Sequence, residues 1–157
     1  MSEIVDPDPA PKAPGRLGQL TSYLLNRIVH RYNQTLQAEL KQKGVTTITM
    51  RTVVSLKVYG ALTVNELCVH AIAEQPTMSR TLDKMEAEGL IAREVSDKDQ
   101  RVRVIRLTGA GEAFYARVWP VMTDANEALL EGVSDEDRAA LMRVLMQILE
   151  NIRKNPF

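Results

Sequence analysis

The chain has 157 residues, of which 45% are hydrophobic, and its twenty basic and twenty acidic side chains give no formal net charge. This composition indicates a packed globular protein and argues against a general polyanion binder, which is usually basic overall. Cys68 is the only cysteine, the N-terminus lacks a signal-peptide pattern and no apolar run could span a bilayer, so we expect a cytoplasmic protein without disulfides.

The N-terminal part of the chain changes character near residue 16. Residues 1–15 hold four of the seven prolines and show no apolar period, so we interpret them as a flexible tail. Apolar residues then recur every three or four positions and predict a helix over residues 17–42, which Gly44 ends. Such a helix is about 36–40 Å long at ~1.5 Å per residue. One of its ends should therefore pack outside its own core.

Three short helices are predicted between residues 49 and 89. Thr49 can cap the first, and Thr63, with Glu66 three residues later, forms a capping box for the second, over residues 63–73. The third begins at Pro76 and ends at Gly89. Its apolar residues share one face and predict its buried side: Met78, Leu82 and Met85.

A hairpin is predicted next, with strands over residues 90–95 and 102–107. In the second strand Val102 and Val104 can face the helices, which leaves Arg101 and Arg103 facing solvent. The adjacent Ile105 and Arg106 break the alternation and predict a bulge or a register end there. Asp99 precedes Arg101 by two residues, and its carboxylate could hold the Arg101 guanidinium extended.

Two long helices complete the chain. Thr108 can cap a helix over residues 109–131, in which Pro120 should produce a kink, and Ser134 can cap a helix over residues 135–154. The last helix has an apolar face that a single small lobe cannot cover. The whole chain is thus predicted to be mainly α with a small two-stranded β wing.

The short helix pair carries side chains suited to DNA. A turn of about three residues separates the two helices, which is typical of a helix-turn-helix whose second helix enters the major groove. Opposite the buried face of that helix lie Thr77, Ser79, Arg80 and Lys84. Arginine can pair with guanine, while Thr and Ser can contact bases or phosphates. A solvated helix pair and a basic edge that only blunts aggregation are the alternatives for the pair and the strand.

A helix-turn-helix followed directly by a hairpin with a basic strand has the order of a winged helix, and residues 76–111, PTMSRTLDKMEAEGLIAREVSDKDQRVRVIRLTGAG, resemble the MarR family of bacterial winged-helix regulators. The family's Thr-x-Ser-Arg falls on Thr77, Ser79 and Arg80. Its Leu-Glu-x-x-Gly-Leu-Ile-x-Arg falls on residues 85–93, with Met85 in the place of leucine. Its Asp-x-Arg and Leu-Thr-x-x-Gly fall on residues 99–101 and 107–111. Gln100 stands where many members carry another arginine.

The resemblance covers about residues 17–154 and implies an obligate-type homodimer. Its dimerisation helices would be residues 17–42, 109–131 and 135–154 around a winged helix-turn-helix over residues 49–107, in one domain over residues 16–157. The expected interface residues are Leu17, Leu20, Leu145, Ile148 and Ile152. The expected partner is double-stranded DNA with a pseudo-palindromic operator, contacted by the four outward residues of the recognition helix and by Asp99, Arg101 and Arg103.

The resemblance further implies a repressor that a small aromatic or phenolic anion releases from DNA, with Arg16, Tyr23 and His30 as candidate ligand contacts. The sequence offers no catalytic constellation, no cofactor motif and no metal-ligand spacing around His30 or His70. We therefore expect a regulator and no enzyme. The alternative is a helical dimeric protein-interaction module that does not bind DNA. The operator, the regulated genes, the sign of regulation, the effector and any redox role of Cys68 stay open.

Overall fold

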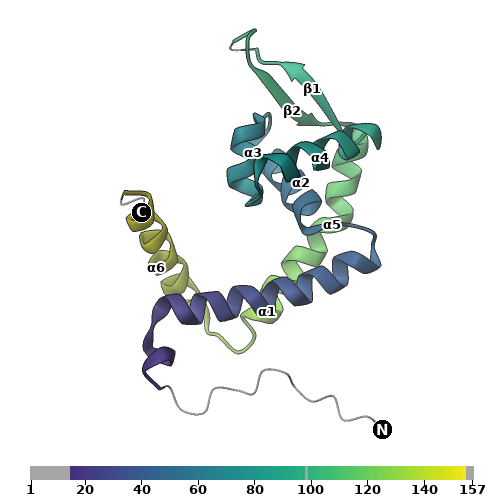
Figure 1. Ribbon diagram of the computed structural model, residues 1–157. Helices are drawn as coiled ribbons and strands as arrows, with labels where there is room; N and C mark the ends of the chain where they lie inside the picture. The colour runs from purple at the N-terminus through teal and green to yellow at the C-terminus, as the bar shows by residue number, and fades with distance from the viewer. Residues whose placement is uncertain (1–14, 98, 155–157) are drawn as a thin grey trace.

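The computed structural model describes residues 15–97 and 99–154 and shows a mainly helical chain with one two-stranded sheet (Figure 1). The predicted tail, except for Gly15, lies outside the described residues. A short 3-10 helix, Arg16–Gln19, comes first. The elements that follow are α1 Thr21–Gln42, α2 Thr47–Tyr59, α3 Val64–Ala71, α4 Gln75–Ala87, β1 Ile91–Val95, β2 Arg103–Leu107, α5 Gly109–Leu129 and α6 Asp135–Lys154.

Three predicted helix caps are confirmed. Thr63 Oγ1 accepts a hydrogen bond from the Glu66 N–H at 3.3 Å, and Glu66 Oε2 accepts one from the Thr63 N–H at 2.7 Å, which completes a capping box. The hydrogen bonds that the Glu66 carboxylate accepts from the backbone N–H and from the hydroxyl of Thr63 hold the pKa of Glu66 below its usual value. Thr108 caps α5 and Ser134 caps α6 in the same way, each by accepting from a backbone N–H three residues on.

Two predicted helix starts are wrong. Thr46, and not Thr49, caps α2: Thr46 Oγ1 accepts from the Thr49 N–H at 3.1 Å, so the helix begins at Thr47. The predicted helix over residues 17–42 is broken at Leu20, whose extended backbone (φ −86°, ψ 116°) separates the 3-10 helix from α1. Apolar periodicity runs through both pieces and therefore could not reveal the break.

The helices α2, α3 and α4 and the ribbon enclose one apolar core, which forms the winged helix. Its members are buried to between 0% and 8% exposure: Val53, Leu56, Leu62, Leu67, Ala71, Met78, Leu82, Met85, Leu90, Ile91 and Ile105. The buried face predicted for α4 is thus confirmed. The predicted bulge or register end at Ile105 and Arg106 is wrong, because β1 and β2 pair antiparallel in unbroken register from Ile91↔Leu107 to Val95↔Arg103.

The reason for the broken alternation in β2 lies on its other edge. Leu62 pairs with Ile105 through two backbone hydrogen bonds of 2.7 and 3.1 Å. Val104 and Ile105, which point to opposite faces of the strand, are both buried, at 8% and 1% exposure. The strand is therefore hydrogen-bonded on both of its edges and covered on both faces at this point, so it does not need the half-buried pattern of an isolated ribbon.

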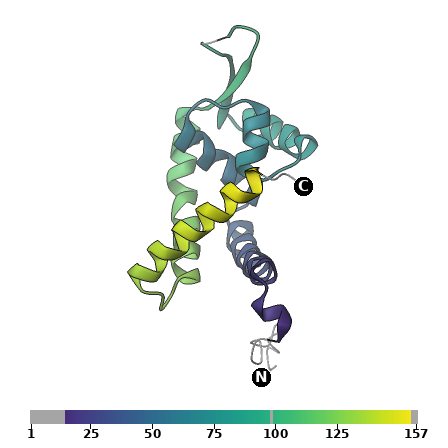
Figure 2. The same cartoon turned by 90° about the vertical axis from the view of Figure 1, so that its left-hand side faces the viewer.

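A second core joins the C-terminal half of α1 to α2 and α5. It contains Leu36, Leu40, Val45, Met50, Val118, Val121 and Ala125. Two segments extend away from both cores: residues 16–31, which comprise the 3-10 helix and the N-terminal half of α1, and the whole of α6 (Figures 1 and 2). We call these two segments the arm. No helix in the described part of the chain is long and apolar enough to cross a membrane.

Candidate nucleic-acid interface

The rotation of α4 is set by its buried residues. Met78, Leu82 and Met85 are at most 1% exposed. Since each residue turns the helix by about 100°, this orientation directs Arg80 away from the core. Arg80, Thr77 and Lys84 are exposed, and Ser79 is half-buried. The structure therefore presents the four predicted side chains on or beside one outward surface.

The N-terminus of α4 adds a polar feature to this surface. Its N-cap residue, Glu74, makes no side-chain hydrogen bond to the helix, and Pro76 lies in the first turn. The first backbone N–H groups of a helix have no partner within the helix, and they attract anions. Arg80 extends along the same turn, with its Nε donating to the Pro76 carbonyl oxygen at 3.2 Å. This end of α4 is thus able to bind a phosphate beside a guanidinium.

Arg93 of β1 neutralises the acidic side chains of α4. Its guanidinium lies 2.6 Å from Asp83 Oδ1 and 2.7 Å from Glu86 Oε2. Both bonds join the strand to the helix, so they position the wing relative to α4 and also offset two negative charges next to the outward surface. Sequence reasoning did not assign this role, because the partners lie seven and ten residues away in different elements. The sequence feature that could have identified this role is Arg93 itself, the last residue of the Leu-Ile-x-Arg motif.

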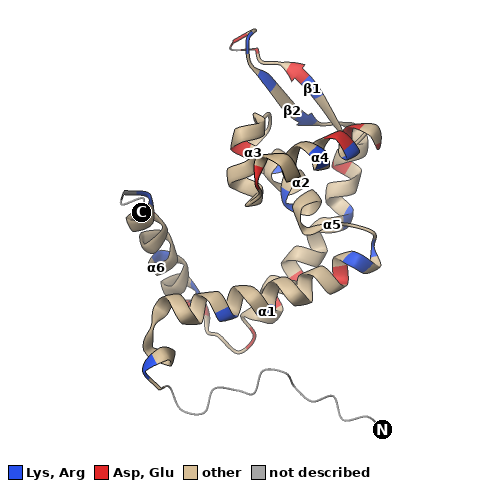
Figure 3. Ribbon diagram, in the orientation of Figure 1, with Lys and Arg blue, Asp and Glu red and all other residues tan. Residues whose placement is uncertain are grey.

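The other three arginines of the wing fall into two groups. Arg106 is held by Glu94 Oε2 at 2.9 Å and by Asp97 Oδ2 at 3.2 Å. Arg101 and Arg103 are exposed and have no ion-pair partner among the described residues. Figure 3 shows these alternating charges along the ribbon. The wing therefore has its free positive charge near its tip, on Arg101 and Arg103.

The predicted brace between Asp99 and the Arg101 guanidinium is wrong. Asp99 Oδ1 accepts a hydrogen bond from the backbone N–H of Arg101 at 2.9 Å, which is the turn-forming bond usual for aspartate. The Asp99 carbonyl oxygen also accepts from the Val102 N–H at 3.0 Å. Asp99 thus shapes the turn and leaves the Arg101 side chain unrestrained. Lys98, in the same turn, lies outside the described residues.

The base of the wing is fixed against α5. Thr108 Oγ1 donates to the Gly89 carbonyl oxygen at 2.6 Å, and the Thr108 N–H donates to that of Leu90 at 3.1 Å. A Cβ on Gly111 would collide with the Leu90 carbonyl oxygen, so only glycine allows α5 to start this close. The Leu-Thr-x-x-Gly motif is therefore the joint between the wing and the long helix.

The candidate ligand contacts lie along α1 and before it. Arg16 is exposed in the 3-10 helix. Tyr23 is half-buried, with its hydroxyl oxygen 3.4 Å from the Arg27 Nη1, and His30 Nε2 lies 3.0 Å from Gln34 Nε2. These side chains interact with their neighbours on the helix and are not brought together around one cavity by a single chain.

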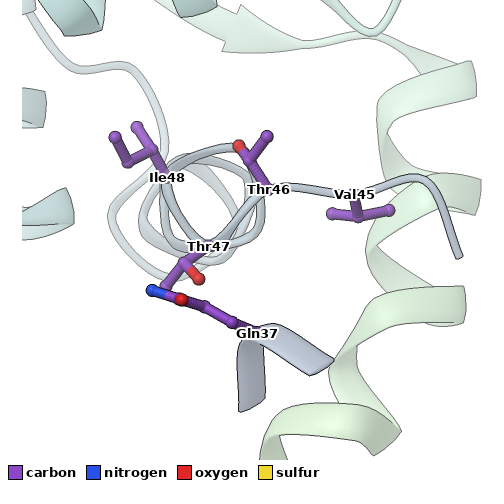
Figure 4. A pocket seen from close by; sticks show the side chains of 5 residues that line it. All are labelled: Gln37, Val45, Thr46, Thr47 and Ile48. Carbon is purple, nitrogen blue, oxygen red and sulfur yellow. The ribbon is translucent and has the colours of Figure 1, made fainter. Parts of the chain in front are cut away.

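Two cavities lie beside the C-terminal half of α1. One, of about 260 Å³, is lined by Gln37 of α1 and by residues 45–48 (Figure 4), and the Thr47 hydroxyl there is buried without a hydrogen-bond partner. The other, of about 370 Å³, is lined by Tyr32 and five residues of α5 including Trp119. Burial raises the pKa of Tyr32. Trp119 is 36% exposed. Arg16, Tyr23 and His30 line neither cavity.

Cys68 and the histidines show no sign of a reactive or metal site in the part of the chain that the structure describes. Cys68 is half-buried against the winged-helix core, as expected for a packing residue. His70 stacks on Tyr59 with ring centroids 4.3 Å apart. Among residues 15–97 and 99–154, no three His, Cys, Asp or Glu side chains are grouped to hold a metal ion.

Comparison with known proteins relates the chain to one family. Residues 43–102 match the MarR family. A MarR-family transcriptional regulator from Silicibacter pomeroyi is 38% identical, with a TM-score of 0.80 over 90% of this chain and 95% of that chain. The fold is shared at lower identity by MepR of S. aureus in complex with DNA (24%, TM-score 0.72, 85% and 96% covered). It is also shared by BpsR of Bordetella bronchiseptica, whose structure concerns regulation of its DNA binding by 6-hydroxynicotinic acid (19%, TM-score 0.73, 86% and 96% covered).

Proposed function

The chain belongs to the MarR family of transcriptional regulators, and on that premise we propose that α4 reads a DNA operator in the major groove while the wing enters the adjacent minor groove. A member of this family is a regulator and not an enzyme. The contacts we assign to DNA are Thr77, Ser79, Arg80, Lys84, Arg101 and Arg103, with Asp99 shaping the tip of the wing.

The observation that carries this proposal is the distribution of free and neutralised cations. Arg93 and Arg106 are each bound by two carboxylates. Arg80, Arg101 and Arg103 are exposed and have no carboxylate partner within the described residues. An unpaired guanidinium can bind guanine or phosphate without first breaking an ion pair, and arginine is favoured in a narrow minor groove. The free charges are on the surface of α4 and at the wing, as a winged-helix contact requires.

We infer that the operator is pseudo-palindromic and that the protein binds it as a homodimer. The exposed apolar side chains of the arm support this inference: Leu17, Leu20 and Ile152 are 61%, 53% and 51% exposed, beside half-buried Leu145 and Ile148. Two-fold symmetry would place the two recognition helices about 34 Å apart, one turn of DNA. A relative with the same fold, MepR, is known in complex with DNA.

We propose that the protein acts in the cytoplasm, where chromosomal DNA is reached, as a repressor that a small aromatic or phenolic anion releases. The support is that a relative with the same fold, BpsR, has its DNA binding regulated by 6-hydroxynicotinic acid. In this chain Arg16, Tyr23 and His30 offer a cation, a phenol ring and an imidazole on the arm. A ligand there would act by favouring one separation of the two recognition helices over another.

The test is DNA selection from a random pool, followed by affinity measurements on the selected site. Phosphate contacts should give a steep fall of log affinity with log salt, whereas a protein-interaction module would select no site. Arg80→Ala should weaken binding by roughly 1–3 kcal/mol and relax specificity at one base pair. Arg117→Ala, an exposed arginine on α5, is the matched control and should leave affinity unchanged. Failure to select any sequence would contradict the proposal.

A further inference from the structure

The winged helix carries one exposed apolar patch that DNA binding does not explain. Four large side chains near the C-terminal ends of α2 and α3 form it: Val58, Tyr59, Val69 and Ile72, which are 61%, 59%, 68% and 75% exposed. The stacking of Tyr59 on His70 shows that the two helix ends are adjacent. We call Val58, Tyr59, Val69 and Ile72 the α2–α3 patch. Val95, on the wing, is the other large apolar side chain of the winged helix that is exposed among the described residues, and it is not part of the patch.

The backbone conformation and the solvent exposure of Ile72 are both unfavourable in the single chain. It terminates α3 in the left-handed region, with φ 55° and ψ 58°, where a β-branched residue is strained and glycine is usual. Its side chain is also 75% exposed, so water meets most of its apolar surface. Neither the strain nor the exposure benefits the single chain. A surface that is covered in the working protein would explain an isoleucine at this position.

The helix α6 carries more apolar surface than one neighbour can cover. A first row, Leu141, Leu145, Ile148 and Ile152, contains the residues that we assign to the dimer interface. A second row, Met142, Met146 and Leu149, lies about 90° further round the helix. These three side chains are 59%, 61% and 47% exposed. Leu149 is followed one turn later by Arg153.

The charges beside these two surfaces are complementary. Glu74 follows the α2–α3 patch, is exposed and has no ion-pair partner within the described residues. Arg143 and Arg153 flank the second row of α6, are exposed and likewise lack a partner there. The acidic residue of α3 itself, Glu66, is engaged in its capping box. Figure 3 shows basic residues toward the end of α6. Among the described residues, the patch thus has one acidic residue without an ion-pair partner beside it. The second row of α6 has two such arginines beside it, in a group that also contains Glu150.

We propose that the α2–α3 patch of each winged helix is covered by the second row of α6 from the other copy in the dimer. The exposure of the patch shows that α6 of the same chain does not cover it. Figure 1 shows the C-terminal end of α6 reaching toward the side of the winged helix on which α3 lies. A partner α6 that ran beside this helix in the same direction would bring its C-terminal end toward α3. This inference rests on the homodimer proposed above.

Such a contact ties the arm of one copy to the recognition helix of the other. Ile72 lies in the three-residue turn that directly precedes α4. Any shift of the partner's α6 would therefore move the base of α4 and change the separation of the two recognition helices. Interfaces of this kind have discrete arrangements, so an effector that binds the arm could act through this contact.

Disulfide trapping between chains tests the contact. In a Cys68→Ser background, Ile72→Cys and Met146→Cys are made in separate full-length chains, which are mixed, allowed to exchange subunits and oxidised. Each chain then has one thiol, so a disulfide between the two variants must join different copies. We expect this mixed species to dominate. The control replaces Ile72→Cys by Val95→Cys, which is on the wing and 48% exposed, and should give little product.

The other outcomes are informative. Sedimentation is measured on the same samples: a dimer without the mixed disulfide overturns this inference and leaves the proposed function standing, whereas a monomer overturns both. A disulfide between two Ile72→Cys chains would mean that the patches cover each other, which also overturns the inference.

Charge reversal gives an independent test. Glu74→Arg and Arg153→Glu should each reduce the yield of the mixed disulfide and weaken the dimer by up to about fivefold, which corresponds to a partly exposed ion pair. The double variant should restore both. Ile72→Gly relieves the backbone strain, so the winged helix should be at least as stable while the dimer weakens. Independent effects of the two charge reversals, with no restoration, would overturn the pairing.

Discussion

The winged helix and the arm bury their apolar residues to different extents. In the winged helix, eleven core residues from three helices and the ribbon are at most 8% exposed. In the arm, large side chains such as Leu17, Met142 and Met146 are about 60% exposed. At ~25 cal/mol per Å² of apolar surface, burial in a second copy is strongly favourable. One chain thus completes the core of its winged helix but leaves the apolar surface of the arm uncovered, as expected if the proposed homodimer forms.

Breaking the arm should have the largest effect. Leu145→Asp with Ile148→Asp places two charges in the proposed interface, so we expect monomers with an intact winged helix. A monomer contacts one half-site, and loss of the second linked contact should reduce affinity about 100-fold or more. Sedimentation and DNA titration measure the two effects. Gln147→Asp, on the polar face of α6, is the control and should stay dimeric. A dimer in the double variant would contradict the assigned interface.

A cavity in the core of the winged helix should destabilise the winged helix and leave the arm unaffected. Leu82 is 0% exposed, and Leu82→Ala should lower the free energy of unfolding by about 2–5 kcal/mol. DNA binding should be lost at lower temperature, because α4 loses the contact that sets its rotation, while the dimer persists. Thermal melts with DNA titrations measure this. Val95→Ala, at an exposed site, should change stability by less than about 0.5 kcal/mol. Equal effects of both substitutions would contradict the assigned core.

The smallest expected effects are those of substituting Arg101, in the turn of the wing, and Arg106, in β2. Arg101→Ala should weaken DNA binding by roughly 1 kcal/mol, most where the flanking minor groove is narrow, and should leave stability unchanged. Arg106→Ala breaks exposed ion pairs to Glu94 and Asp97 and should change stability by at most about 1 kcal/mol. Affinities for the selected site with A·T-rich and G·C-rich flanks decide between them. If Arg101→Ala binds both flanks like the parent protein, the wing is not a DNA contact.

Local patterns in the sequence determined much of the fold and part of the candidate site. The capping box of Thr63 and Glu66, the caps at Thr108 and Ser134 and the buried face of α4 all follow from residues three or four positions apart. Because helix hydrogen bonds and helix faces repeat over that distance, they could be predicted. The outward position of Arg80 followed directly from the buried face. The family resemblance rested on the same short segment.

Only the tertiary structure decided which charges are free. The pairing of Arg93 with Asp83 and Glu86, and of Arg106 with Glu94 and Asp97, joins residues from different elements. The bridge between Leu62 and Ile105, which explains why the alternation of β2 breaks without a bulge, joins residues more than forty positions apart. No local period encodes such pairs, since they form only when the helices and the ribbon have packed. The sequence does not distinguish these four arginines. In the structure Arg93 and Arg106 form ion pairs, whereas Arg101 and Arg103 have no ion-pair partner among the described residues.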